Sequence, residues 1–304
     1  MIFEVTILGS ASAIPTRKRF PSAQLVHLPG RLFLIDCGEG TQIQLIKEGI
    51  GLQKIDRIFI SHMHGDHFYG LPGLLSSMHL SGRTQSLWIY GDANLEPLVM
   101  PLVQYSHQQL GFDIQFIILD MKQPKEIYAD NECRILAIPL KHGIDTYGFM
   151  FQEKPRLRNI DKAFVAQYQP SITDMQAIKL GHDYVDSAGQ TIENQAITKA
   201  PPAPRAYAYC SDTAYFDKLP EYIHAATTLY HEASFLQKDV DLAHQRNHST
   251  VKEAAAVAAK ANVKKLIVGH FSARYKDTAD ILREATEIFP HTIIAEDLMK
   301  ITIE

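Results

Sequence analysis

The feature that most constrains the fold of this 304-residue chain is a cluster of histidine and aspartate side chains that directly follows an apolar strand. The run DRIFIS at 56–61 has the composition of a buried strand, and four potential metal ligands follow it within six residues: His62, His64, Asp66 and His67. Imidazole and carboxylate groups together favour zinc, with manganese or iron as alternatives. A histidine-rich surface loop is the other interpretation, but the interleaved acid after an apolar strand favours a metal site.

Three further ligand-type residues follow other apolar runs. His142 comes after RILAIPLK, Asp212 after AYAYCS and His270 after KLIVG. Each alone is consistent with a polar residue that ends a strand, but α/β sheets place their sites at strand ends. Together with the first cluster they predict a dinuclear centre, in which Asp212 is the natural bridge because a carboxylate has two oxygens to share.

Two metal ions predict hydrolytic chemistry. Ions roughly 3.5–4 Å apart activate a water and stabilise charge on a phosphoryl or carbonyl oxygen. The ligands alone do not choose between phosphodiester, lactone, thioester and amide substrates.

Short β-rich runs alternate with helical stretches, which predicts a mixed α/β layered fold. The expected strands are 2–8, 23–28, 31–36, 56–61, 86–91, 114–119, 133–140, 147–153, 206–211, 265–269 and 291–297. The expected helices are 41–49, 71–80, 95–110, 218–230, 250–261 and 278–289. Residues 154–204 show few such patterns, and long structureless loops within a domain are usually functional or mobile. We therefore expect one domain over 1–304 that carries an inserted arm at 154–204.

Composition excludes several classes of protein. With 46% hydrophobic and 21% charged residues, the chain is not mainly disordered. It has no apolar run near the ~20 residues of a membrane helix, and its N-terminus lacks a signal peptide, so we expect a cytoplasmic protein. The net charge of −4 argues against a general nucleic-acid coat but leaves room for a local basic patch. Cys37, Cys133 and Cys210 are too few for a disulfide framework and are expected to be reduced, half-buried thiols.

The cluster, together with His142, Asp212 and His270, resembles the metallo-β-lactamase superfamily. Further strings resemble the ribonuclease Z family over nearly the whole chain. They are FLIDCGEGTQ (33–42), GLPGLLSSM (70–78), HEAS (231–234), HST (248–250) and HFSARY (270–275). The resemblance implies a four-layer αβ/βα sandwich and a short, homodimeric form.

The resemblance also implies an activity: a zinc-dependent endoribonuclease that removes the 3′ trailer from precursor tRNA. Hydroxide bridging two zinc ions would attack phosphorus after the discriminator nucleotide, leaving a tRNA with a 3′-hydroxyl and a trailer with a 5′-phosphate. One zinc would be held by His62, His64 and His142, the other by Asp66, His67 and His270, with Asp212 between them.

Glu232 and His248 match the proton-transfer pair of the family, and with Asp66 they are the predicted catalytic residues. The departing ribose oxygen needs a proton, which a histidine supplies while a carboxylate orients the ring and raises its pKa. From the residues alone, a helix-end salt bridge for Glu232 and a helix start for His248, before the capping residues Ser249 or Thr250, are the simpler interpretations.

Two segments are candidates for RNA contact. Arg17, Lys18 and Arg19 lie in a loop that resembles the Pro-x-Lys-x-Arg pattern of the family, with Arg17 in the place of the Lys so that the charge is kept. They suit phosphate contacts, although a solvated charged turn has the same composition. The arm lies where the family has its tRNA-gripping exosite, and Lys179-Leu180-Gly181 survives there while the Gly-Pro motif does not. Its six basic and five acidic residues argue against a strong RNA clamp.

Two other functions remain open at this point. One is a hydrolase of small phosphodiesters or other small esters on the same scaffold. The other is a non-catalytic RNA-binding or assembly subunit, which the filled ligand positions disfavour.

Overall fold

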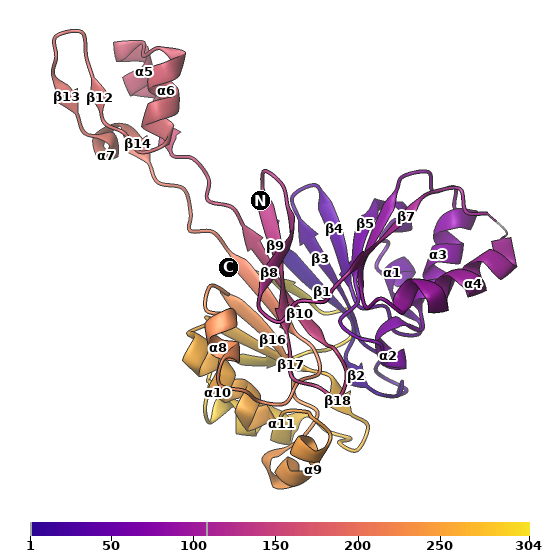
Figure 1. Cartoon of the computed structure of the whole chain (residues 1–304). Coiled ribbons are helices and arrows are strands. Elements are labelled where there is room, and N and C mark those ends of the chain that lie inside the picture. The colour runs from indigo at the N-terminus through magenta and orange to yellow at the C-terminus, as the bar shows by residue number, and fades with distance from the viewer. Residues whose placement is uncertain (1, 108) are drawn as a thin grey trace. The chain divides into compact units, whose positions relative to one another are not determined.

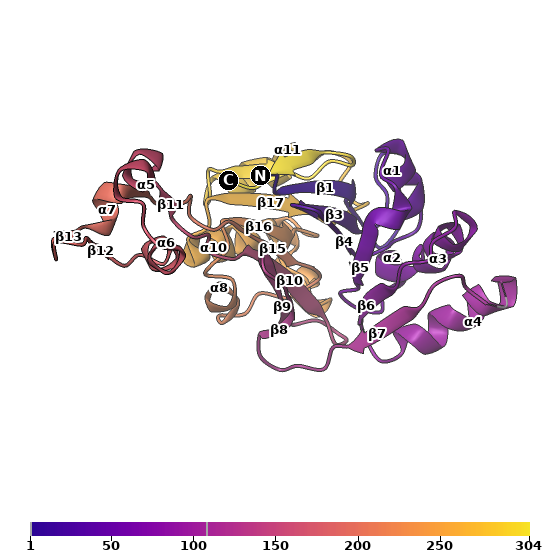
Figure 2. The same ribbon diagram turned by 90° about the horizontal axis from the view of Figure 1, so that it is seen from above.

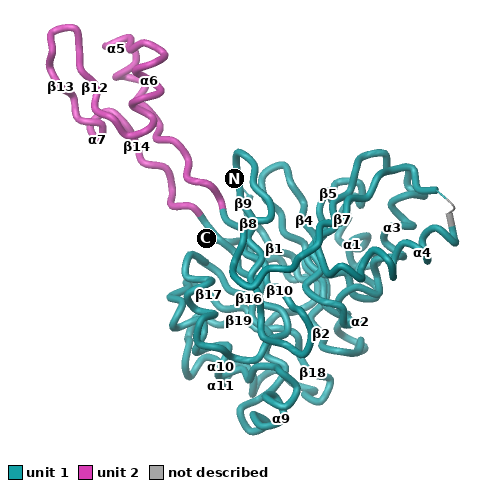
Figure 3. The backbone as a smooth tube through the Cα atoms, viewed as in Figure 1, with its two compact units in different colours: residues 1–152, 205–304 teal, residues 153–204 magenta. Residues whose placement is uncertain are grey.

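The computed structural model describes residues 2–107 and 109–304, which form two compact units (Figures 1 and 3). Unit 1 comprises residues 1–152 and 205–304, and unit 2 comprises Glu153–Pro204. Part of the helix expected at 95–110 falls on residue 108, which lies outside the described residues.

Unit 1 is built on two seven-stranded sheets. The strands of the first are β1 (Glu4–Gly9), β3 (Ala23–Leu28), β4 (Arg31–Ile35), β5 (Ile55–Phe59), β6 (Leu87–Gly91), β7 (Ile114–Ile118) and β20 (Lys300–Thr302). Those of the second are β8 (Lys125–Ala129), β9 (Cys133–Pro139), β10 (Tyr147–Glu153), β15 (Ala206–Cys210), β16 (Thr228–Glu232), β17 (Lys265–Gly269) and β19 (Thr292–Ile294). Their spatial orders are β20-β1-β3-β4-β5-β6-β7 and β19-β17-β16-β15-β10-β9-β8.

The two sheets pack face to face on a core rich in aromatic residues. Phe33 of β4 and Phe59 of β5 are fully buried against Phe151 of β10, with ring centroids 5.7 Å and 5.6 Å away. Alternate residues of each strand face this core because successive side chains of a strand point to opposite faces. These ring contacts hold the first sheet against the second.

Helices cover the outer face of each sheet (Figure 2). The first sheet is covered by α1 (Thr41–Lys47), α3 (Leu71–Leu80) and α4 (Leu95–His107), and the second by α8 (Leu219–Tyr222), α10 (Val251–Ala261) and α11 (Ala279–Thr286). The remaining short elements are β2 (Ala11–Ser12), β18 (Phe271–Ser272), α2 (Gly65–Phe68), α9 (Val240–Gln245) and the 3₁₀ turns Leu52–Lys54 and Gln237–Asp239. The expected four-layer αβ/βα sandwich is confirmed.

Parallel pairing aligns the ends of three of the strands that precede predicted ligands, β5, β15 and β17. In the first sheet β4, β5, β6 and β7 are parallel neighbours, and in the second β15, β16, β17 and β19 are. The carboxyl ends of each parallel set meet at one edge of its sheet, which is where such sheets place their sites.

Most expected elements lie within one or two residues of the observed ones, but the helix expected over 218–230 is wrong. The segment contains the short helix α8 and then the buried strand β16, which pairs in parallel with β15 and β17. A continuous apolar run is compatible with both a buried strand and a buried helix, so the sequence pattern alone does not distinguish them.

Unit 2 folds around its own small core. Phe164 of α5 (Lys162–Tyr168), Ile178 of α6 (Ile172–Lys179) and Ile197 of α7 (Asn194–Ile197) are buried together. Two short ribbons pair β11 (Asn159–Ile160) with β14 (Thr198–Lys199), and β12 (Tyr184–Val185) with β13 (Thr191–Ile192).

The expectation that 154–204 lacks regular structure is therefore wrong. Its two longer helices have only about two turns each, which is too short to show an apolar period. Their signals are local: Asp161 caps α5, and Ser171 and Asp174 form a capping box at the start of α6.

Two sequence expectations concern membranes and thiols. Among the described helices, none has the length and apolar character to cross a membrane. Cys37, Cys133 and Cys210 are free thiols, but they are fully buried rather than half-buried. Burial raises the pKa of each to about 12, so these thiols are inert packing groups.

Candidate metal centre

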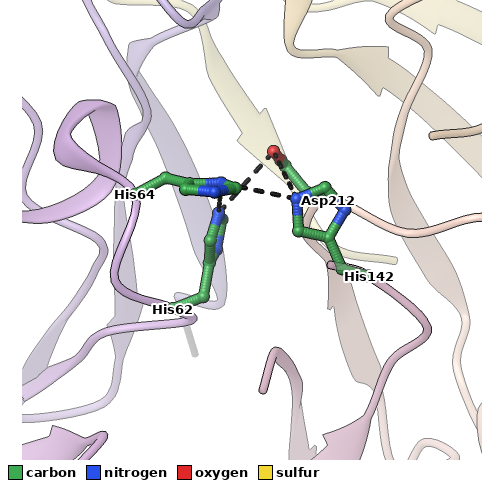
Figure 4. Close-up of side chains that lie close together, drawn as sticks. All are labelled: His62, His64, His142 and Asp212. Carbon is green, nitrogen blue, oxygen red and sulfur yellow. Dashed lines mark hydrogen bonds and ion pairs between the residues drawn. The ribbon is translucent and has the colours of Figure 1, made fainter. Parts of the chain in front are cut away.

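The first group of predicted ligands brings together side chains from three segments (Figure 4). His62 and His64 follow β5, His142 follows β9 and Asp212 follows β15, and one ligand atom of each lies within 4.8 Å of the others. His64 Nδ1 lies 3.0 Å from His62 Nε2 and 3.4 Å from His142 Nε2. Asp212 Oδ2 lies 3.7 Å from His62 Nε2. Three ring nitrogens and one carboxylate oxygen thus converge on a space that a divalent ion could fill.

The second group lies beside the first and consists of Asp66, His67 and His270. Asp66 Oδ2 is 3.5 Å from both His67 Nε2 and His270 Nε2. Asp212 Oδ1 lies 3.2 Å from His270 Nε2 and 3.5 Å from His67 Nε2. Asp212 therefore turns one oxygen to each group, as a bridging carboxylate would.

Three buried atoms at the second group support a cation there. Within the described residues, His67 Nε2, His270 Nε2 and Asp212 Oδ1 have no hydrogen-bond partner. Leaving a buried polar atom unpaired costs about 1–3 kcal/mol, so native structures rarely do it. A cation bound among these atoms would satisfy all three, and the mixed nitrogen and oxygen donors fit zinc, manganese or iron.

The charge balance at the second group also favours a cation. Burial alone would lower the pKa of His67, but Asp66, Asp36 and Asp212 outweigh burial and raise it to about 10. Burial alone would raise the pKa of Asp66, but His67 and His270 hold it well below its usual range. The surrounding carboxylates thus favour positive charge at this group, which a bound ion held by Asp66, His67 and His270 would supply.

Four of the five histidine rings are oriented through their outer nitrogen, Nδ1, so that Nε2 faces the cluster; His64 presents Nδ1 instead. Such outer hydrogen bonds fix the ring and its tautomer in metal sites. The pairs are His62 with Ser61 Oγ (3.0 Å), His67 with Asp36 Oδ2 (2.8 Å), His142 with the Asn247 carbonyl oxygen (2.8 Å) and His270 with Ser234 Oγ (3.0 Å).

Asp36 is a residue to which the sequence analysis gave no role. It directly follows β4, is fully buried and adopts a left-handed φ of 55°. Its carboxylate holds His67 and accepts hydrogen bonds from the Ser61 backbone N–H (2.7 Å) and the Tyr209 hydroxyl (2.7 Å). The available signal was its place in FLIDCGEGTQ, after an apolar strand. We assign it the positioning of His67.

Asp36→Asn is expected to weaken metal binding without unfolding the protein. Asparagine keeps the size of the side chain but removes the charge that holds the Nδ1–H of His67, and such outer-sphere changes cost about 10- to 100-fold in metal affinity. Competition with a chromogenic chelator measures this loss, and Asp113→Asn, at an exposed aspartate before β7, is the matched control. Unchanged affinity in folded Asp36→Asn would contradict the assignment.

Glu232 and His248 form a hydrogen-bonded pair next to the ligand groups. Glu232 is the last residue of β16, and its Oε1 lies 2.7 Å from His248 Nδ1. The buried carboxylate also accepts backbone N–H bonds from Thr213 (3.1 Å), Ser249 (3.2 Å) and Ser234 (3.0 Å). Glu232 therefore lies at a strand end rather than at the helix end that a simple salt bridge would suggest.

The pair carries a separated charge. Burial would raise the pKa of Glu232, but His248 outweighs burial and lowers it to about 2. Burial would lower the pKa of His248, but the attraction of Glu232 raises it to about 9. The pairing with Glu232 thus favours the protonated form of His248 and engages Nδ1 of its ring. The ring lines a cavity of about 420 Å³ together with His64, Asp66 and Asp212.

The predicted RNA-contact residues fall in both units. Arg17 and Lys18 are exposed in a loop whose Pro15 lines the same cavity. Arg19 is less exposed, because its guanidinium lies 4.9 Å from the centroid of the Phe271 ring. Lys179 is an exposed residue at the end of α6 and belongs to unit 2.

A four-layer αβ/βα sandwich with a His/Asp cluster at the strand ends defines a metal-dependent hydrolase of the metallo-β-lactamase fold. Ribonuclease Z of Bacteroides thetaiotaomicron is 42% identical over 301 residues, 99% of this chain and 95% of that protein. Ribonuclease Z of Parabacteroides distasonis is 40% identical over 301 residues, 99% of each chain. Residues 3–186 match the family described as Anti-Pycsar protein Apyc1.

Solved structures agree. The short form of human tRNase Z superposes with a TM-score of 0.71 at 27% identity and covers 99% of both chains. The metallo-β-lactamase fold protein YhfI of Bacillus subtilis superposes with a TM-score of 0.70 at 17% identity, over 99% of this chain and 100% of that one, a likeness of fold. The chain belongs to the ribonuclease Z family and, through residues 3–186, to the Apyc1 family.

Proposed function

We propose that this protein is a zinc-dependent endoribonuclease that removes the 3′ trailer from precursor tRNA, leaving a tRNA with a 3′-hydroxyl and a trailer with a 5′-phosphate. The observation that carries the proposal is Asp212, whose two oxygens join two ligand groups beside the Glu232–His248 pair. The relatives are named for ribonuclease Z and tRNase Z, which supports precursor tRNA as the substrate. From the family resemblance we also propose a homodimer that acts in the cytoplasm.

The proposal gives each ligand residue a place. His62, His64 and His142 would hold one ion, Asp66, His67 and His270 the other, and Asp212 both. When bound, two such ions supply an activated water and stabilise negative charge on a phosphate. Two zinc ions per chain are proposed, and manganese or iron suits the same donors.

Glu232 and His248 would move the proton that the reaction needs. Cleavage releases the 3′ oxygen of the discriminator ribose, which must gain a proton as it departs. Glu232, fixed by three backbone N–H groups, holds Nδ1 of His248 and stabilises the protonated ring. Nε2 of His248 is the atom that would donate the proton.

Basic residues would hold the rest of the RNA. Arg17 and Lys18 are exposed in the loop whose Pro15 lines the cavity, and they suit phosphate contacts. Arg19 also has a structural role, because it packs against Phe271. Unit 2, with Lys179, is proposed as the tRNA exosite.

A hydrolase of small phosphodiesters on the same scaffold is the second candidate, and the charge of unit 2 favours it. Residues 154–204 contain six basic and five acidic residues, so the segment is nearly neutral. Two of the basic side chains have partners within the unit: Arg156 lies 3.1 Å from Glu153, and Arg158 donates to Thr198 Oγ1 at 2.7 Å. Affinity for an RNA backbone depends on free cations, so we expect unit 2 to bind RNA more weakly than a strongly basic arm would.

The two candidates differ in the substrate that the enzyme prefers. The test compares kcat/KM of the zinc-loaded protein for a precursor tRNA with kcat/KM for bis(p-nitrophenyl) phosphate, with each substrate also used as a competitor of the other. A strong preference for precursor tRNA supports the endoribonuclease. Hydrolysis of the small ester with no cleavage of tRNA would contradict the endoribonuclease and support the small-phosphodiester hydrolase.

Removal of unit 2 is expected to separate the two substrates. Replacing residues 156–200 by a short Gly/Ser linker should reduce kcat/KM for precursor tRNA by about tenfold or more, as phosphate contacts are lost. Hydrolysis of the small ester should be spared, because unit 2 has its own core of Phe164, Ile178 and Ile197. An equal loss on both substrates would mean that unit 2 supports the fold of unit 1.

A further inference from the structure

One exposed aromatic residue lines the cavity of the candidate metal centre and takes no part in the proposed chemistry. Tyr69 directly follows α2, two residues after His67, and its side chain is 67% exposed. It lines the same cavity as His64, Asp66, Asp212 and His248. A substrate whose phosphate reaches these ligand groups therefore passes next to this ring.

The Tyr69 ring rests on the backbone of Gly65. A Cβ atom at Gly65 would lie 2.2 Å from Tyr69 Cε2 and 2.4 Å from Tyr69 Cζ, so a larger residue at that position would displace the ring. The backbone N–H of Tyr69 also donates to the Gly65 carbonyl oxygen at 3.0 Å, which closes the helical turn beneath the ring. A ring held in this way loses little conformational entropy when it meets a ligand.

The loop that contains Ala13 also lines the cavity and is fixed to the second ligand group. Ser12, Ala13, Pro15 and Pro21 are its lining residues from this part of the chain. The backbone N–H of Ala13 donates to Asp66 Oδ2 at 2.7 Å, and Ala13 takes a left-handed φ of 61° to do so. The cavity is thus lined by a positioned aromatic ring and by small side chains, and the exposed cations Arg17 and Lys18 follow its lining residue Pro15 in the sequence.

We propose that Tyr69 is a stacking platform for the nucleobase of one RNA nucleotide that flanks the scissile phosphate. Every base has a π face, so stacking on an aromatic ring holds a single-stranded nucleotide without reading its identity. This suits an enzyme that must accept different bases at the cut. The assignment rests on the proposed function, because it requires an RNA strand at the metal centre.

The test combines variants of Tyr69 with abasic substrates. Tyr69→Ala should reduce kcat/KM on an intact precursor tRNA by about 5- to 100-fold, the range found when a stacking ring is removed. Tyr69→Phe should stay close to wild type, because the ring and not the hydroxyl is used. Tyr105→Ala is the matched control, since Tyr105 is 94% exposed on α4 and does not line the cavity.

The abasic substrates locate the contact. Precursors that lack the base at either of the two nucleotides flanking the cut should show which position erases the difference between wild type and Tyr69→Ala. The Kd of an uncleavable precursor, in which a methylene replaces the bridging 3′ oxygen, should rise in Tyr69→Ala in the same base-dependent way.

Three results would overturn the assignment. Full activity of Tyr69→Ala on the intact precursor would exclude a contact. A loss that is equal on intact and abasic substrates, with a changed oligomeric state in sedimentation, would mean that the ring packs against a second copy of the chain. Failure of the wild-type protein to cleave the intact precursor would overturn the proposed function itself, and the Tyr69 assignment with it.

Discussion

Asp212→Ala is expected to remove bound metal and abolish hydrolysis of every substrate. The side chain turns Oδ2 to His62 and Oδ1 to His67 and His270, so its loss takes a donor from both ligand groups at once. Metal ions supply several kcal/mol of transition-state stabilisation, so the expected loss of rate is on the order of 10³-fold or more. Elemental analysis of the purified variant should find fewer than two ions per chain.

The control for this variant is an aspartate on the same segment outside the cluster. Asp217 is exposed and bonds only the Tyr215 hydroxyl among the interactions described, so Asp217→Ala should keep both metal content and activity. Circular dichroism establishes that each variant is folded. Two ions and full activity in Asp212→Ala would show that this carboxylate does not bridge the groups.

His248→Ala is expected to keep both ions and lose rate on RNA by about 10²- to 10⁴-fold, the usual contribution of a general acid. Glu232 keeps its three backbone hydrogen bonds in this variant, so the fold around the carboxylate is retained. A p-nitrophenyl ester should be cleaved at nearly the wild-type rate, because nitrophenolate departs without a proton. Rates on the two substrates measure the effect.

The same experiment decides between two roles for His248. Its ring also lies within 4.8 Å of ligand atoms of Asp212 and His270, a third set that could hold an ion. If His248 were a ligand, His248→Ala would lose metal and would slow the ester as much as the RNA. His244→Ala is the control: His244 is half exposed, pairs with Glu253 at 2.7 Å and should change neither rate.

Much of the metal site could be predicted from the sequence, because the patterns that mark its ligands are local. His62, His64, Asp66 and His67 lie within one short run, and the remaining predicted ligands each follow an apolar strand whose length and composition are plain. The structure brings all seven together, five of them from positions that follow strands and two, Asp66 and His67, from the short helix α2. The strands β10 and β17 end at the predicted residues for the same reason, since each is a continuous apolar run with a clear boundary.

What the sequence did not reveal depends on contacts between distant segments. The contact of Asp36 with His67 arises because β4 and β5 are parallel neighbours, which places the residues after both strands side by side. Arg19 looks like a free cation until the Phe271 ring is brought beneath it by the pairing of β2 with β18. The strand β16 is specified by its buried place between β15 and β17, which no local pattern reports.

The central claim is tested most directly by cleavage of a precursor tRNA that carries a 3′ trailer, with both product ends mapped. The zinc-loaded protein should cut after the discriminator base and leave a 3′-hydroxyl on the tRNA and a 5′-phosphate on the trailer. A chelator should abolish the cut, and added zinc should restore it. Cutting at other positions, or cutting by metal-free protein in the presence of chelator, would contradict the account.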